Sequence, residues 1–164
     1  MRMNLKYLSI YLNDHLAGAT VGVELSKRAA SSNEDTEYGD FLAELSHEIA
    51  EDRASLERLM DRFGVKKDRV KTTGAFLGEK MGRLKPNAHL TGYSPLSRVI
   101  ELEGLALGVT GKLGLWQALI GVQDADDRLD PEELRVLAER AESQQRGLEQ
   151  WRRRATSETF TAPE

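Results

Sequence analysis

The sequence predicts an all-α fold built from four long amphipathic helices. Apolar residues recur at alternating spacings of three and four in four separate stretches, which is the pattern of a helix with one buried face. The four prolines lie outside the interiors of these stretches, where proline would break a helix. Of the 164 residues, 40% are hydrophobic and 30% are charged, which is typical of a globular chain. We expect one helical domain at residues 1–156 and a flexible C-terminal tail at 157–164.

The first helix is predicted over residues 3–30. Its apolar stripe has heptad spacing and contains Leu5, Leu8, Leu12, His15, Ala19, Gly22 and Ser26. After a short polar break, a second stripe contains Tyr38, Leu42, Leu45, Ile49, Asp52, Leu56, Leu59 and Phe63. Gly64 follows this second helix as a left-handed C-cap. Because the break is short, the two helices should be antiparallel neighbours.

A shorter connecting helix is predicted over residues 66–85, ending before Pro86. The third long helix begins at Ser94 and Pro95, an N-cap followed by proline at the first helical position. Its stripe contains Val99, Leu102, Ala106, Val109, Leu113, Trp116 and Ile120. A capping box at 130–133 opens the fourth helix. The fourth stripe contains Leu134, Leu137, Ala141, Gln144, Leu148, Trp151 and Ala155.

Charge and composition exclude several classes of function. The 23 basic and 27 acidic residues give a net charge of −4, whereas nucleic-acid binding needs a basic surplus, so no nucleic-acid partner is expected. The absence of cysteine excludes disulfides and thiol chemistry. The apolar stretch 104–122 carries Lys112 at its centre, which costs roughly 2.5–3.5 kcal/mol in a membrane, so we expect a buried helix and no membrane partner. Polar residues interrupt the apolar start of the chain at 13–15, which favours a cytoplasmic protein without a secretory signal.

The predicted order of helices, with a long connection between the second and third, is similar to that of the ferritin-like superfamily. The stretch YLNDHLAGATVGVEL also resembles the opening of small bacterial proteins of that superfamily. The resemblance implies a four-helix bundle with a shorter connecting helix, and it brings no specific activity with it. The di-metal members of the superfamily use one Glu from each of two helices and a Glu-x-x-His from each of the other two.

The metal ligands that this resemblance implies are incomplete. The chain has one Glu-x-x-His motif, Glu44 to His47, and at about 100° per residue it lies away from the stripe of its helix. Glu101 and Glu103 flank the heptad of the third helix rather than occupy it, and the fourth helix has no histidine. We therefore expect a degenerate metal site, with Glu44 and His47 on a solvated face.

A different set of polar residues is predicted to point inward. His15, Asp52 and Gln144 each lie on an apolar stripe near the middle of a helix, so they should form one buried polar layer. Such a layer fixes helix register, as a buried Asn does in coiled coils. The alternatives are a small-ligand pocket, a single metal site, or unrelated and partly exposed residues. A metal site would use His15, Glu48 and Asp52 to bind iron or manganese, although no cofactor is favoured.

The third helix is unusually rich in glycine. Gly104, Gly108, Gly111 and Gly114 each weaken a helix by about 1 kcal/mol relative to Ala, so we expect a packing reason for them. The resulting ridge would dock the connecting helix or the first helix within one chain, or a second copy of the protein in a homo-oligomer. The predicted function is that of a non-catalytic binding or association protein, and the alternative is a metal-dependent oxidase or metal-handling protein.

Overall fold

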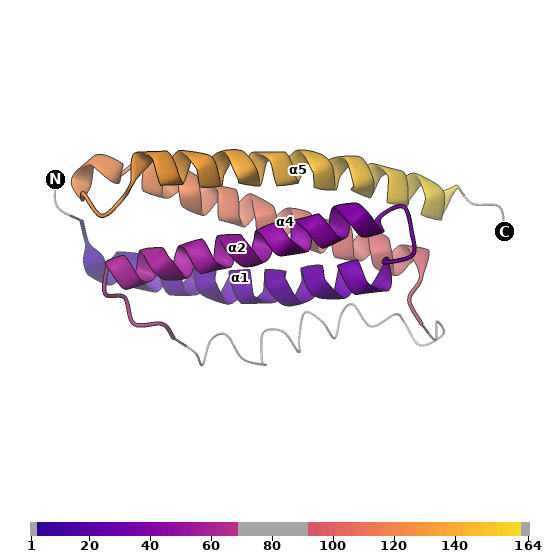
Figure 1. Cartoon of the computed structure of the whole chain (residues 1–164), viewed down its shortest axis with the longest axis horizontal. Helices are drawn as coiled ribbons and strands as arrows, with labels where there is room; N and C mark the ends of the chain where they lie inside the picture. The colour runs from indigo at the N-terminus through magenta and orange to yellow at the C-terminus, as the bar shows by residue number, and fades with distance from the viewer. Residues whose placement is uncertain (1–2, 69–91, 162–164) are drawn as a thin grey trace.

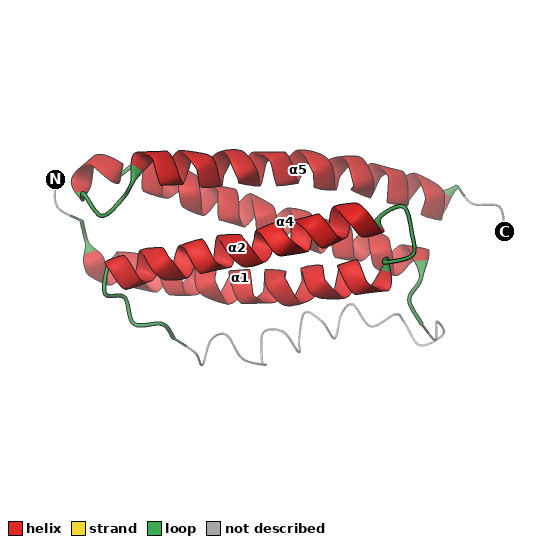
Figure 2. Ribbon diagram, in the orientation of Figure 1, coloured by secondary structure: helices red, strands yellow, loops and turns green. Residues whose placement is uncertain are grey.

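The computed structural model describes residues 3–68 and 92–161. Within these ranges the protein has four long α-helices, one short 3-10 helix and no strand, as the secondary-structure colouring of Figure 2 shows. The elements are α1 (Leu5–Ser32), α2 (Gly39–Arg62), α4 (Pro95–Ile120), η1 (Gln123–Ala125) and α5 (Pro131–Phe160). The predicted all-α class is confirmed.

The four helices lie side by side along one long axis (Figure 1). Helices α1 and α5 run in one direction, and α2 and α4 run in the opposite direction. Close backbone contacts join α1 to α2, α1 to α4, and α4 to α5. The predicted connecting helix lies largely outside the described residues, and residues 66–68 at its expected start are not helical.

Local capping chemistry sets the helix ends. The Ser94 hydroxyl accepts a hydrogen bond from the Ser97 N–H at 3.1 Å, and the Asp130 carboxylate accepts one from the Glu132 N–H at 2.9 Å. Beyond α2, Gly64 has a φ of +64°, and the Val65 N–H donates to the Met60 carbonyl at 2.9 Å. This is a Schellman motif, which favours glycine because its left-handed position disfavours a side chain. The predicted caps at Gly64 and Ser94 and the N-cap at Asp130 are confirmed. The capping box predicted at 130–133 is shown only in part, because the Glu133 carboxylate accepts a hydrogen bond from Arg62 at 2.6 Å.

The C-terminal helix is longer than predicted. Helix α5 extends to Phe160, so the expected flexible tail at 157–164 is wrong for residues 157–160, while 162–164 lie outside the described residues. A hydrogen bond from a distant segment stabilises the C-terminal end of α5, and the periodicity of α5 does not predict it. The Tyr38 hydroxyl donates a hydrogen bond to the Glu158 carboxylate at 2.7 Å.

The core runs the length of the molecule and includes residues from all four long helices. Its most completely buried side chains include Leu12, Leu59, Trp116, Leu134 and Leu148. Among the described residues, no helix combines the length and apolar character needed to cross a membrane.

Candidate functional site

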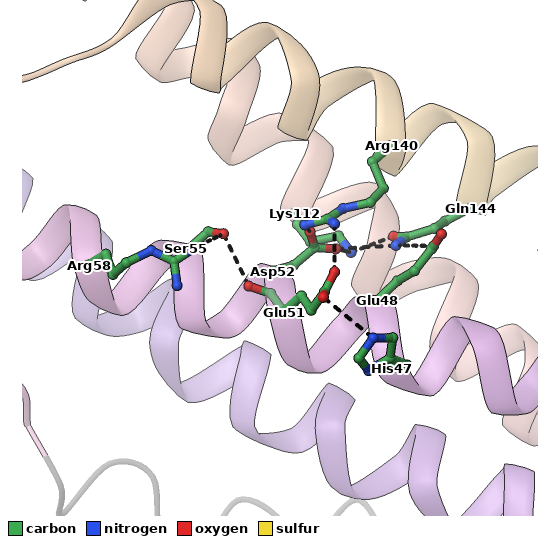
Figure 3. Close-up of polar contacts among 9 residues, drawn as sticks. All are labelled: His47, Glu48, Glu51, Asp52, Ser55, Arg58, Lys112, Arg140 and Gln144. Carbon is green, nitrogen blue, oxygen red and sulfur yellow. Dashed lines mark hydrogen bonds and ion pairs between the residues drawn. The ribbon is translucent and has the colours of Figure 1, made fainter.

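A cluster of charged and amide side chains lies at the centre of the bundle, between α2, α4 and α5 (Figure 3). We call it the central polar cluster; it consists of Glu48, Asp52, Lys112, Arg140 and Gln144. Asp52 and Gln144 are only 2% and 3% exposed. The structure therefore brings together two of the three residues of the predicted polar layer.

Asp52 is the hub of this cluster. Its Oδ2 atom accepts a hydrogen bond from Lys112 Nζ and another from Gln144 Nε2 at 3.2 Å. Its Oδ1 atom forms an ion pair with the Arg140 guanidinium. Lys112 Nζ also donates to Gln144 Oε1, and Gln144 Nε2 donates to Glu48 Oε2 at 2.8 Å. These contacts link three helices through their polar side chains.

Helix geometry explains how these residues meet. Asp52 follows Leu45 and Ile49 on the inward face of α2, and residues spaced by three or four share one helix face. Arg140 and Gln144 share a face of α5 for the same reason. Lys112 lies beside the stripe of α4, and its long side chain reaches Asp52 from there.

The cluster is balanced in charge, with two carboxylates facing two cations. Burial lowers the pKa of the Lys112 ammonium, and the Arg140 guanidinium acts in the same direction, whereas the Asp52 carboxylate opposes both. A buried ion pair is tolerated when its partners satisfy one another's hydrogen bonds. Both oxygens of Asp52 contact cations. The cluster is therefore better suited to fixing the positions of the helices than to transferring a proton.

Lys112 and Arg140 were not predicted as site residues. The signal for Lys112 was present, because it is the only charged residue in the apolar stretch 104–122. It was interpreted only as evidence against a membrane span. Arg140 gives no comparable signal, since α5 is rich in charged residues and the periodicity alone does not distinguish the inward arginine.

His15 lies outside the central polar cluster. It is half-buried on α1, and its ring lies edge-on to the Tyr11 ring, with the centroids 4.6 Å apart. Burial lowers the pKa of His15, while the nearby Asp14 carboxylate partly opposes this. The position of His15 on the stripe was therefore insufficient to place it beside Asp52.

The metal-binding residues considered from the sequence do not form a ligand set. Among residues 3–68 and 92–161, no three His, Asp or Glu side chains gather closely enough to hold a metal ion. In the set His15, Glu48 and Asp52, the Asp52 carboxylate is already held by two cations. Glu44 and His47 are exposed as predicted, and His47 lies 3.4 Å from a Glu51 carboxylate oxygen.

Next to the central polar cluster, α1, α2 and α4 line a cavity of about 650 Å³ that is partly open to solvent. Its walls are mostly apolar, and they include Gly18, Val21, Leu25, Ile49, Leu56 and Leu115. Polar groups in the lining come from Asp14, His15, Asp52, Arg53, Glu103, Lys112 and Trp116. Small-molecule sites are typically cavities of roughly 300–1,000 Å³ with apolar walls and a few polar groups, and this cavity matches that description.

Two hydrogen-bond donors in this lining have no partner among the described residues. They are the indole Nε1 of Trp116 and the guanidinium Nε of Arg53. Trp116 is only 1% exposed, so solvent does not satisfy its N–H group. Neither donor atom has appreciable accessible surface, so neither faces the open space of the cavity. From the sequence, Trp116 was interpreted as a core residue alone.

The glycine ridge of α4 borders this cavity. A Cβ atom added at Gly104 would lie 3.1 Å from Leu25 Cδ2, which is a close contact with α1. At Gly108, Gly111 and Gly114, an added Cβ would meet no described atom within 4 Å. Helix α1 therefore packs closely on the ridge only at Gly104. The docking of the connecting helix that the ridge also suggested falls outside the described residues.

Glu101 corrects another expectation. It was predicted to flank the core, yet it is 1% exposed. Arg28 Nε donates to Glu101 Oε1 at 2.7 Å, and the Tyr93 hydroxyl donates to Glu101 Oε2 at 2.8 Å. These contacts tie the start of α4 to the end of α1. The long partner side chains make burial of this carboxylate possible.

Comparison with known proteins found no matching family model, no matching curated protein and no matching solved structure. The arguments about function therefore rest on the residues and geometry of this chain.

Proposed function

We propose that this chain is a non-catalytic binding protein that holds a small, largely apolar molecule in the cavity between α1, α2 and α4. The observation that carries the proposal is the cavity itself, with its volume of about 650 Å³ and its mostly apolar lining. The glycines of α4 support this proposal, because larger residues in place of Gly108 and Gly111 would fill part of the cavity.

The central polar cluster supports a structural role beside this cavity. Asp52 is paired with Lys112 and Arg140, and Glu48 accepts a hydrogen bond from Gln144. Such clusters specify how helices align. The cluster would hold α2, α4 and α5 in position while the adjoining cavity binds its ligand. The ion pair between Asp52 and Lys112, which both line the cavity, supports a structural role for these two residues.

A ferritin-like assignment forms part of the proposal. Its support is the parallel direction of α2 and α4 (Figure 1) and the long connection between them, since ferritin-like bundles contain one long crossover. The proposal places the protein in the cytoplasm, because a chain without cysteine fits a reducing compartment.

The test is binding of N-phenyl-1-naphthylamine, a neutral apolar probe whose fluorescence increases in an apolar site. The Trp151→Phe variant leaves Trp116 as its only tryptophan, so energy transfer from Trp116 to the probe reports binding in this cavity. We expect saturable binding to this variant with transfer from Trp116. Absence of binding, or binding without transfer, would contradict the proposal.

A matched pair of variants locates the site. Gly111 lines the cavity and Gly114 does not, yet both are exposed glycines of α4 with open space around them. Gly111→Leu should weaken probe binding by about tenfold or more, equivalent to about 1.4 kcal/mol, because the new side chain fills the cavity. Gly114→Leu should leave binding unchanged. Equal weakening by both substitutions would place the probe elsewhere.

A second candidate function is self-association through the same face of α4. It is favoured by Leu107, which is 75% exposed and lies beside the exposed Gly108. Sedimentation of the wild type and of both leucine variants separates the two functions. A dimer that dissociates in Gly111→Leu and Gly114→Leu alike would favour association. Iron or manganese near one equivalent in protein purified without added metal would instead favour the metal-dependent alternative.

A further inference from the structure

We infer that the ligand of this cavity carries one long unbranched hydrocarbon chain, and that the contact between Leu25 of α1 and Gly104 of α4 sets the maximum length of that chain. The inference rests on the proposed function and adds the class of ligand and the residue that limits its size. Three features carry it: the elongated shape of the cavity, the closure of one of its ends, and the open space along its glycines.

The cavity is elongated along the bundle, beside two helices, α1 and α4, that run in opposite directions (Figure 1). Its lining on α1 extends from Asp14 to Leu25, which is about 16 Å at 1.5 Å per residue. Its lining on α4 extends from Ile100 to Trp116, which is about 24 Å at the same rise. A cavity of this length with a volume of about 650 Å³ is narrow, so it suits one extended chain better than a compact molecule.

One end of the cavity is closed by contacts between α1 and α4. A Cβ atom added at Gly104 would lie only 3.1 Å from Leu25 Cδ2, so the Leu25 side chain lies directly against the α4 backbone. One turn further along both helices, Arg28 Nε donates to Glu101 Oε1 at 2.7 Å. The lining on α1 ends at Leu25. A chain that lies between the two helices therefore ends at the Leu25 side chain.

Away from Leu25, glycines leave room for a chain. Gly108 and Gly111 of α4 line the cavity, and an added Cβ atom at either would meet no described atom within 4 Å. Gly18 of α1 also lines the cavity, and an added Cβ there would meet no described atom within the same distance. Open space therefore borders glycines of both helices, and a hydrocarbon chain would occupy it.

The distribution of polar residues orients the chain. Asp14 and His15 line the end of the cavity that is farthest from Leu25 along α1. The lining near Leu25 is largely apolar and includes Val21, Gly22 and Leu105. Glu103 also lines this part, but its side chain is half exposed and so reaches solvent. Because burial of apolar surface is favourable, the end of the hydrocarbon chain lies near Leu25 and any polar group of the ligand lies toward Asp14 and His15.

The distance between these two ends sets the expected length of the chain. Along α1 the cavity spans about 16 Å between Asp14 and Leu25. A staggered hydrocarbon chain extends by about 1.3 Å per carbon, given C–C bonds of about 1.5 Å. The cavity therefore holds about 12–14 carbons of an extended chain. Carbons beyond this number would remain in solvent, so they would add no affinity.

The experiment measures displacement of N-phenyl-1-naphthylamine by the unbranched primary alcohols from hexanol to hexadecanol, each below its solubility limit. Each added methylene should lower the displacing concentration about fourfold, because it buries more apolar surface. We expect this gain to stop at about 12–14 carbons. Cyclododecanol has as many carbons as dodecanol but cannot extend along the cavity, so it should need an approximately tenfold higher concentration.

Two variants and a matched control locate the closed end. Leu25→Ala shortens the side chain that closes the cavity, so the gain should continue for about two more carbons. Gly108→Leu blocks the cavity one turn nearer the polar end, so the limit should fall by about four carbons. Gly114→Leu is the control, because Gly114 is not part of the cavity lining, and it should leave the limit unchanged.

The outcomes separate this inference from the proposed function. If Leu25→Ala fails to fold, Gly108→Leu and its control still test the length limit. The inference is overturned, and the proposed function stands, if the probe binds but the gain continues through hexadecanol, if cyclododecanol equals dodecanol, or if no alcohol displaces the probe. A folded Leu25→Ala or Gly108→Leu variant with an unchanged limit also overturns it. If the probe does not bind to the wild type, both fail.

Discussion

Replacement of Lys112 by methionine tests the central polar cluster directly. The Lys112 side chain is 16% exposed and donates to both Asp52 and Gln144. Methionine keeps a similar unbranched shape but offers no N–H donor. Among the described residues, the substitution therefore leaves the buried Asp52 with Arg140 as its only cationic partner, and it leaves Gln144 Oε1 without this donor.

The expected loss of stability follows from these contacts. Removal of one partner from a buried ion pair costs about 3–5 kcal/mol, because the remaining charge stays in a poorly solvated site. For a chain of 164 residues, each kcal/mol lowers the melting temperature by about 2–4 °C. We therefore expect a decrease of roughly 6–20 °C, with a matching decrease in the free energy of unfolding.

Urea unfolding followed by far-ultraviolet circular dichroism measures this free energy. Lys27→Met is the matched control, because Lys27 is 63% exposed and its pair with Glu24 is on the surface; we expect a change within about 0.5 kcal/mol. Adding Asp52→Asn to Lys112→Met should recover part of the loss, since it removes the stranded charge. If Lys112→Met changes stability no more than the control does, the cluster does not hold the helices together.

Three further predictions concern other parts of the chain. Gly111→Ala should raise the free energy of unfolding by about 0.4–1 kcal/mol. Gly147→Ala should lower it, because the new Cβ would lie 2.7 Å from Phe41 Cε2. If urea unfolding shows the opposite order, the packing around these two glycines is contradicted. Because burial lowers the pKa of His15 from 6.5, the unfolded chain binds a proton more readily. Stability should therefore fall as the pH drops below about 6.5 through the depressed folded pKa, and His15→Gln should lose this part of the pH dependence; an unchanged pH profile would contradict burial of the imidazole. Glu101→Ala should cost about 1–3 kcal/mol, because the partly exposed Arg28 and Tyr93 lose their hydrogen-bond acceptor. A cost below about 0.5 kcal/mol in the same urea assay would show that the carboxylate is solvated.

The helices were predictable from the sequence because their signals are local. Proline at the first position and a capping side chain before it mark the starts of α4 and α5, whereas Gly64 marks the end of α2. These residues act within one turn of the chain, so no knowledge of the remaining fold is needed. The end of α5 was not predictable in this way, because Tyr38 from a distant segment binds Glu158.

The inward faces were also largely predictable, since an apolar stripe gives the direction of each residue around its own helix. Asp52 and Gln144 lie on such stripes, and both are buried. An apolar stripe does not show which other helix it packs against, or at what distance. His15 lies on the stripe of α1 but lines the cavity, and within residues 3–68 and 92–161 it is only half-buried.

The sequence by itself therefore determined the four helices, their caps and the burial of Asp52 and Gln144. Only the tertiary structure decided that Lys112 and Arg140 neutralise Asp52, that Glu101 is buried, and that the glycines of α4 border a cavity. The physical reason is that helical periodicity is a property of neighbouring residues, whereas ion pairs and cavities depend on the distance and rotation between helices. Long side chains reach buried partners from the flank of a stripe, and a glycine leaves space only where the opposite helix does not fill it.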